Sequence, residues 1–283
     1  MSKDLYDISS QICSKVITNQ YSTSFSMGIR TLQKPYRMPV YSIYGYVRLA
    51  DEIVDTFHNF DKVDLLEAFK KDTYEAIDKG ISLNPILNAF QLVVNQYGIE
   101  KELIDAFLLS MEMDLSENSH NDATYKTYIY GSAEVVGLMC LRVFVDGDDQ
   151  LYQALKEPAR RLGSAFQKVN FLRDIQSDYH ERGRVYFPGV DFDHFHNNDK
   201  EAIQKDIEAD FLAAYEGIVR LPKGSRKGVY LAYVYYLKLF RKIKKLPASK
   251  ILKSRIRIPD LTKLALLLPV LLSNNLSSPQ FSK

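Results

Sequence analysis

Apolar residues recur at spacings of three and four along most of the chain, and this periodicity limits the folds that the sequence can adopt. Such spacing places apolar side chains on one face of an α-helix, because the helix has 3.6 residues per turn. The clearest predicted helices run through residues 65–77, 103–115 and 231–243. Alternation over the length of a strand is rare, and neither an internal repeat nor a Pro/Gly/Ser-rich linker is visible. We predict a single all-α domain over residues 1–283, with about eight to twelve helices of average length and a frayed tail from about residue 274.

Polar residues, glycine and proline mark the predicted helix ends. A helix is expected to start at Ser82, ahead of Asn84-Pro85. Breaks are predicted near residues 147 and 183, and residues 189–199 read as a polar surface loop.

The composition excludes several classes of protein. Apolar residues make up 46% and charged residues 25% of the chain, and the net charge is +2; these values argue against disorder, a collagen-like chain and a strongly basic nucleic-acid-binding protein. Two cysteines, Cys13 and Cys140, form no disulfide framework and indicate a reducing compartment. The first residues do not resemble a signal peptide, and the longest late apolar run, Leu264–Leu272, is far shorter than the about 20 residues that span a membrane. We therefore expect a cytoplasmic protein with, at most, peripheral membrane contact.

Charge is unevenly distributed along the chain. Residues 217–259 contain thirteen Lys and Arg but no Asp or Glu, which leaves the rest of the chain with a net charge of −11. Such a separation suits a protein that binds anions with one region and cations with another. The basic segment 241–257 leaves open a different class of function, the binding of an anionic surface or a non-catalytic role in assembly. No nucleic-acid-binding motif accompanies it, so no nucleic-acid partner is expected.

Aspartates at helical spacing are the most unusual feature of the sequence. Asp51 and Asp55 stand four residues apart, and Tyr44 and Arg48 continue the same helical face. Like charges on one face of an otherwise apolar helix are unfavourable unless a partner neutralises them. A second stripe combines amides with carboxylates at spacings of three, four and four, in the order Gln167, Asn170, Asp174, Asp178.

Two such pairs predict a site for divalent cations. One aspartate pair alone is usually a solvated helix face, but two pairs with arginines beside them favour a functional site. Mg²⁺ prefers oxygen ligands and binds one or two carboxylates together with phosphate and water. We predict Mg²⁺, or Mn²⁺ in its place, between the two pairs, where it neutralises a diphosphate with help from Arg48, Arg173 and the basic C-terminal third.

The two stripes resemble the motifs of the squalene/phytoene synthase family, the head-to-head trans-prenyltransferases. Asp51-Glu-Ile-Val-Asp55 is similar to the first D-x-x-x-D motif of the family, in the form common in phytoene synthases. Residues 170–178 are similar to the second motif, N-x-x-R-D-x-x-x-D, and Tyr186-Phe-Pro188 to the Y-F-P that follows it. The resemblance covers nearly the whole chain, and it implies the isoprenoid synthase fold, a helical bundle around a central prenyl-binding cavity.

The resemblance also implies roles for single residues. The catalytic residues it implies are Asp51, Asp55, Asp174, Asp178, Tyr44, Arg48 and Tyr128. The substrate-binding residues it implies are Ser22, Ser24, Phe25, Arg48, Gln167, Asn170, Arg173, Tyr236 and Arg255. The metal ligands it implies are Asp51, Asp55, Asn170, Asp174 and Asp178. Ser132-Ala-Glu134 departs from the family's usual Val-Ala-Gly, so Glu134 either faces outward or reshapes the pocket.

By resemblance, the function is the condensation of two geranylgeranyl diphosphates to phytoene through prephytoene diphosphate, a step of carotenoid biosynthesis. No NADPH is expected, because phytoene formation needs no final hydride. The alternative within the family is a squalene or dehydrosqualene synthase that uses farnesyl diphosphate.

Overall fold

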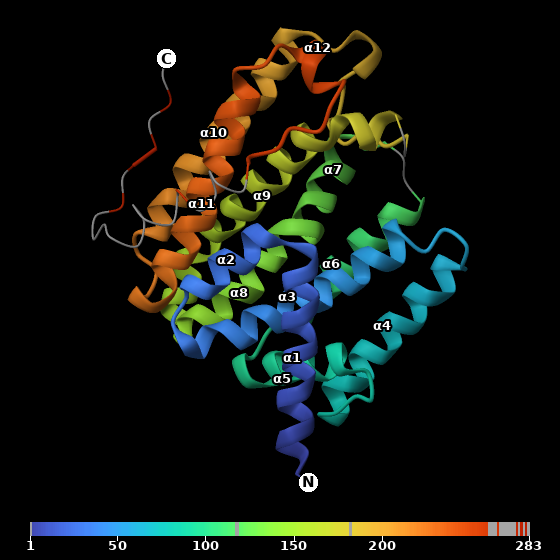
Figure 1. Ribbon diagram of the computed structural model, residues 1–283, viewed down its shortest axis with the longest axis vertical. Helices are drawn as coiled ribbons and strands as arrows, with labels where there is room; N and C mark the ends of the chain where they lie inside the picture. Colours follow the sequence, from blue (N-terminus) through green and yellow to red (C-terminus); the bar gives the residue numbers. More distant parts are fainter. Residues whose placement is uncertain are drawn as a thin grey trace.

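The computed structural model describes residues 2–116, 119–180 and 183–259, together with positions 265, 276, 278, 279 and 281 (Figure 1). Across these residues helices dominate, no strand occurs, and one isolated β-bridge joins Ser119 to Val185. The all-α prediction is therefore confirmed. The elements are, in order, α1 (Lys3–Tyr21), α2 (Thr23–Thr31), α3 (Lys34–Asp55), α4 (Lys62–Lys79), α5 (Pro85–Tyr97), α6 (Lys101–Ser116), α7 (Asp122–Ile129), the π-helical turn η1 (Tyr130–Glu134), α8 (Val135–Val145), α9 (Asp149–His180), the 3₁₀ turn η2 (Phe192–His194), α10 (Asn197–Ile218), α11 (Lys223–Lys244) and α12 (Ala248–Ile251).

Two apolar clusters form the interior. The first gathers side chains of α3, α5, α6 and α8, and it includes Tyr46, which stacks on Phe90 with 3.8 Å between ring centroids. The second is built by α7, α9, α10 and α11, and it includes the fully buried Phe211 and Phe240. Helix α9 packs against both α8 and α10, so it joins the two clusters. This packing holds the predicted site residues of α9 in place between them.

Side-chain caps set several helix ends. Asn84 accepts hydrogen bonds from the amides of Ile86 and Leu87, so it caps α5 in place of the predicted Ser82. Pro85 then occupies the first helical position, where its missing N–H costs no hydrogen bond, so the helix begins directly after Asn84. The break predicted near residue 147 is confirmed by Gly147, whose φ of 87° is a left-handed conformation that glycine adopts without strain.

One continuous helical stretch among the described residues, Asp122–Val145, is long and apolar enough to cross a membrane by length and composition alone. It consists of α7, η1 and α8, and 56% of its most apolar window is buried inside the bundle, as in a core helix. Two glycines allow neighbouring helices to approach it. A Cβ at Gly131 would collide with the carbonyl of Ala106 on α6, and a Cβ at Gly163 on α9 would lie 2.6 Å from the carbonyl of Ala133.

The C-terminal residues that the structure describes contact the second cluster. The Tyr215 hydroxyl on α10 donates to the carbonyl of Leu276 at 2.7 Å, and the ring of Phe281 lies 6.3 Å from that of Phe240. Most of the tail that was predicted to fray lies outside the described residues, as does the apolar run Leu264–Leu272 apart from the exposed Ala265.

Candidate active site

Arg48 and Asp51 lie on successive turns of α3, on the face that the sequence analysis assigned to the site. Arg48 Nη1 is 3.8 Å from Asp51 Oδ2, and the guanidinium also pairs with Glu52. Its Cζ lies 4.4 Å from the ring centroid of Tyr21, a cation–π contact. Its Nε is buried and has no hydrogen-bond partner among the described residues. A buried donor without an acceptor is unfavourable, so Arg48 is well placed to bind an anionic ligand.

Asp55, at the end of α3, pairs with Arg184, which follows α9. Arg184 Nη1 is 3.0 Å from Asp55 Oδ1 and 3.5 Å from the carboxylate of Asp114 on α6. Its Nη2 also donates to the Asp114 carbonyl at 2.9 Å. The Tyr128 hydroxyl on α7 donates to both Asp114 carboxylate oxygens at 3.0 Å. One arginine therefore connects α3 and α6 to the segment after α9.

The carboxylates of α3 and α6 perturb one another. Burial and the negative charges of Asp55 and Asp114 raise the pKa of Asp51 to about 7, although Arg48 acts in the opposite direction. The Asp51 side chain keeps 33% of its surface exposed, so a ligand can reach it. This crowded set of oxygen donors fits a hard divalent cation, which would neutralise it. As arranged, no group of three or more Asp, Glu, His or Cys among the described residues is close enough to hold a metal.

The aspartates of α9 have different surroundings. Arg173 Nε donates to both Asp174 oxygens at 3.0 and 3.1 Å, and Arg255 Nε lies 2.8 Å from Asp174 Oδ1. Two arginines against one carboxylate leave an excess positive charge, which suits a phosphate ligand. Asp178 is buried, and it lines a small cavity with Arg184 and five other residues, most of them apolar or aromatic. Three of the predicted metal ligands, Asp51, Asp55 and Asp174, thus pair with arginines in this structure.

The amide residues of α9 join a hydrogen-bonded chain. Gln167 Nε2 donates to Ser132 Oγ at 3.4 Å, Asn170 Nδ2 to Gln167 Oε1 at 3.5 Å, and the Tyr236 hydroxyl to Asn170 Oδ1 at 3.2 Å. Phe166 stacks on Tyr236 with 3.9 Å between ring centroids. Ser132 therefore faces the predicted site residues, and α9 and α11 are held together at Asn170.

Aromatic rings from three helices lie side by side next to this chain. Phe25 on α2 is 5.4 Å from Tyr44 on α3 and 6.3 Å from Tyr236 on α11, measured between ring centroids. Burial raises the pKa of Tyr44 to about 12 although the Ser22 hydroxyl hydrogen-bonds to it, so its ring stays neutral. Ser22 also caps α2 by accepting from the Phe25 amide at 3.2 Å, and Ser24 is half-buried on the same helix. The structure thus brings the predicted early Ser-x-Ser-Phe segment next to Tyr44 and Tyr236.

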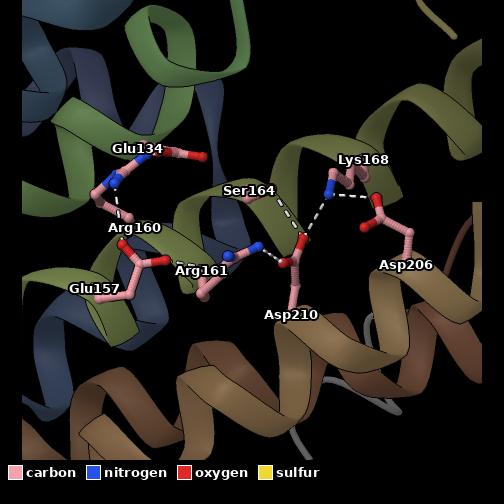
Figure 2. Close-up of polar contacts among 8 residues, drawn as sticks. All are labelled: Glu134, Glu157, Arg160, Arg161, Ser164, Lys168, Asp206 and Asp210. Carbon is pink, nitrogen blue, oxygen red and sulfur yellow. Dashed lines mark hydrogen bonds and ion pairs between the residues drawn. The ribbon is translucent and has the colours of Figure 1, made fainter. Parts of the chain in front are cut away.

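Glu134 points away from that chain. Its carboxylate accepts from Arg160 Nε on α9 at 2.7 Å. Figure 2 shows the network to which this pair belongs, made up of Glu134, Glu157, Arg160, Arg161, Ser164, Lys168, Asp206 and Asp210. Within it the fully buried Asp210 on α10 binds Lys168 at 2.7 Å and Ser164 at 2.9 Å. Glu134, at the end of η1, therefore belongs to a network that joins η1 to α9 and, through Asp210, to α10.

Two residues of the site were missed in the sequence, Asp114 and Arg184. Asp114 lies between apolar residues of α6, and its side chain is only 7% exposed. The sequence signal that could have identified it is a charged residue within an apolar run. Arg184 stands two residues before the Tyr186-Phe-Pro188 motif. Nothing in the spacing of either residue indicates that they meet.

The helical architecture is that of the isoprenoid synthase fold, which the structural neighbours share. The family model described as squalene/phytoene synthase matches residues 18–262. The chain belongs to the squalene/phytoene synthase family, whose members are prenyltransferases that condense prenyl diphosphates head to head.

Individual relatives carry different names. The chain is 26% identical over 261 residues to a phytoene synthase of Arthrospira platensis, covering 83% of this chain and 84% of that protein. It is 26% identical over 209 residues to a 4,4'-diapophytoene synthase of Staphylococcus haemolyticus, covering 71% and 69%. A solved dehydrosqualene synthase in complex with a ligand superposes with a TM-score of 0.79 at 21% identity, covering 93% of this chain and 96% of that one. The structural likeness establishes the fold.

Proposed function

We propose that this protein is a phytoene synthase, which joins two geranylgeranyl diphosphates through prephytoene diphosphate and releases diphosphate. The observation that carries the proposal is the set of unsatisfied or excess positive groups beside an aromatic wall. Arg48 has a buried donor without an acceptor, and Asp174 is bound by two arginines. Both features suit an anionic leaving group, and the Asp-Glu-x-Val-Asp form of the first motif favours phytoene.

The residues of the chain have separate tasks in this reaction. Arg48, Arg173 and Arg255 bind diphosphate and stabilise the negative charge that develops as it leaves. The rings of Tyr44 and Tyr236 stabilise the allylic cation by about 0.5–2 kcal/mol each, and the wall that they form with Phe25 excludes water. Tyr128 orients Asp114 through the hydrogen bonds described above.

Mg²⁺, or Mn²⁺ in its place, belongs to the proposal. The ligands would be drawn from Asp51, Asp55, Asn170, Asp174 and Asp178. When bound, the cation supplies electrostatic stabilisation of the departing diphosphate. No NADPH is part of the proposal.

The test is incubation of the pure protein with geranylgeranyl diphosphate and Mg²⁺, followed by extraction of hydrocarbon. Phytoene is the expected product, and EDTA should abolish it. Asp51→Asn should remove turnover while circular dichroism stays unchanged, whereas Asp72→Asn, on the exposed face of α4, should keep it. A variant of Asp51 that retains full activity would overturn the metal assignment.

The second candidate is the condensation of farnesyl diphosphate to a C30 product. The relative named 4,4'-diapophytoene synthase and the superposed dehydrosqualene synthase favour it. Assays with each diphosphate alone, at equal concentrations, distinguish the two candidates by their kcat/KM. No hydrocarbon from either substrate would favour a non-catalytic role in assembly or at an anionic surface. A cytoplasmic location with peripheral membrane contact, where a hydrocarbon product leaves, completes the proposal.

A further inference from the structure

Helix α1 buries its small polar residues and exposes its large apolar ones. Ser10, Ser14 and Thr18 are all 0% exposed. On the opposite face lies a row that we call the α1 stripe, with exposed fractions of 51% for Leu5, 53% for Ile8, 48% for Ile12 and 52% for Val16. Water favours the reverse arrangement, so the stripe indicates a surface that another molecule covers.

The buried face of α1 explains why the helix cannot simply rotate. The Ser10 hydroxyl donates to the Tyr6 carbonyl at 2.8 Å and accepts from Asn88 Nδ2 on α5 at 3.2 Å. Gly45 on α3 leaves room for Ser14, because a Cβ at Gly45 would lie 2.8 Å from the Ser14 Cβ. A larger residue on this face would not fit, so α1 is locked with the stripe directed away from the bundle. Figure 1 shows α1 along the outside of the molecule.

Further exposed apolar side chains lie beside the N-terminal half of α1. The loop between α4 and α5 holds Ile81 at 43% and Leu83 at 94% exposure. The Tyr6 hydroxyl donates to the Ser82 carbonyl of this loop at 2.6 Å, which ties the loop to α1. The stripe precedes residue 18, where the family match begins, so the reaction shared by the family does not account for it.

We propose that the α1 stripe is the contact surface for a second copy of this chain, with the two α1 helices antiparallel across a two-fold axis. The charged residues beside the stripe favour an antiparallel contact with a second copy. Asp4 and Lys15 are exposed, and neither forms an ion pair with any residue that the structure describes. They stand eleven residues, or about three turns, apart, so they share one side of the helix. An antiparallel pair places Asp4 of each copy opposite Lys15 of the other.

The same register also fits the apolar side chains. When Asp4 lies opposite Lys15, Leu5, Ile8 and Ile12 each fall between two stripe residues of the other copy, as knobs do in a packed helix pair. Val16 then lies opposite position 3, just beyond Leu5 at the edge of the contact. Isologous contact of one patch with itself is the commonest arrangement in homo-oligomers. A bilayer surface fits less well, because helices that lie on membranes carry Lys and Arg on their polar flanks, whereas Asp4 and Lys15 cancel.

Sedimentation of the full chain at micromolar concentration tests the proposal. The expected mass is twice that of one chain. Ile8→Glu combined with Ile12→Glu should weaken association by at least about tenfold, while Leu212→Glu, which changes an exposed leucine of α10, should leave it unchanged. Circular dichroism confirms that the variants keep their helices, since both positions are on an exposed face.

Charge reversal gives the sharper test. Asp4→Lys alone and Lys15→Asp alone should each weaken the dimer, because each brings like charges together, and the double reversal should restore it. A monomeric wild-type protein, or a dimer that survives the stripe variants, would overturn the proposal. So would a monomer that binds vesicles of phosphatidylcholine and phosphatidylglycerol through the stripe, because a lipid surface would then be the occupant.

Discussion

Arg184 and Asp55 are 129 residues apart in the sequence, yet Arg184 Nη1 lies 3.0 Å from Asp55 Oδ1. The same guanidinium binds both the carboxylate and the carbonyl of Asp114. The arginine therefore neutralises carboxylates of α3 and α6 at the point where both helices end. Removing it would take away a positive charge that both acidic groups contact.

We expect Arg184→Met to destabilise the fold by roughly 2–3 kcal/mol, because the buried Asp114 carboxylate would lose its ion pair with Arg184 and the Asp114 carbonyl would lose a hydrogen bond. Urea denaturation followed by circular dichroism measures the free energy of unfolding. The matched control is Lys79→Met, which removes an exposed pair with Glu75 on α4 and should leave stability unchanged. Equal stability of Arg184→Met and the wild type would contradict the role given to Arg184.

Arg255→Ala should raise the KM for the prenyl diphosphate by about tenfold or more, because a guanidinium beside Asp174 contributes a charge-assisted hydrogen bond to phosphate. Steady-state kinetics with varied substrate at fixed Mg²⁺ measures the change. Arg257→Ala removes a second exposed arginine two residues away and should leave KM unchanged. If both variants lose activity equally, overall positive charge matters and the specific contact of Arg255 does not.

Asp210→Ala should cost about 3 kcal/mol of stability, because Asp210 is fully buried and its removal leaves Lys168, itself 6% exposed, with one partner fewer. Asp206→Ala removes the other partner of Lys168, but its side chain is 55% exposed, so the loss should stay below about 1 kcal/mol. Thermal unfolding of both variants gives the comparison. A larger loss for Asp206→Ala would show that burial does not set the strength of these contacts.

Stability should depend on pH through Glu100. Although burial acts to raise it, hydrogen bonds from Arg142 hold the pKa of Glu100 below its usual 4.5. A carboxyl group whose pKa is lowered by folding adds stability at every pH above its unfolded-state pKa. This contribution disappears as the pH falls through the folded-state pKa. Glu100→Gln should therefore be less stable than the wild type by about 1 kcal/mol at neutral pH.

The measurement is the free energy of unfolding at a series of pH values. The difference between Glu100→Gln and the wild type should shrink as the pH falls below 4.5. Glu67→Gln, an exposed change on α4, is the control and should show no such trend. A difference that is constant with pH would mean that the Gln substitution acts through packing and not through charge.

The helices could be predicted from the sequence because apolar spacing reports local geometry. Residues 65–77, 103–115 and 231–243 were predicted as helical, and α4, α6 and α11 confirm them. The faces of α3 and α9 followed for the same reason, since residues four apart share a face wherever a helix forms. The catalytic, binding and metal roles of those residues remain predictions.

The features that could not be predicted depend on contacts between segments far apart in the sequence. Asp114 and Arg184 meet because the C-terminal end of α6 lies beside the segment that follows α9. The spacing of residues in the sequence does not indicate this contact. Glu134 could not be placed either, because its partner Arg160 is 26 residues away on another helix. The exposure of the α1 stripe could not be predicted, because apolar residues at helical spacing give the same sequence pattern whether that helix face is buried or exposed to solvent.

The π-helical turn η1 has a consequence for how this protein can vary. Its closing hydrogen bond runs from the Val135 amide to the Tyr130 carbonyl, one residue wider than an α-helical bond. Deleting one residue from Tyr130–Glu134 would restore the regular bond, but it would also turn α8 by about 100° relative to α7. The buried residues of α8 would then leave the first cluster. This turn therefore cannot accept a change of length, just as Gly131 within it cannot accept a larger side chain.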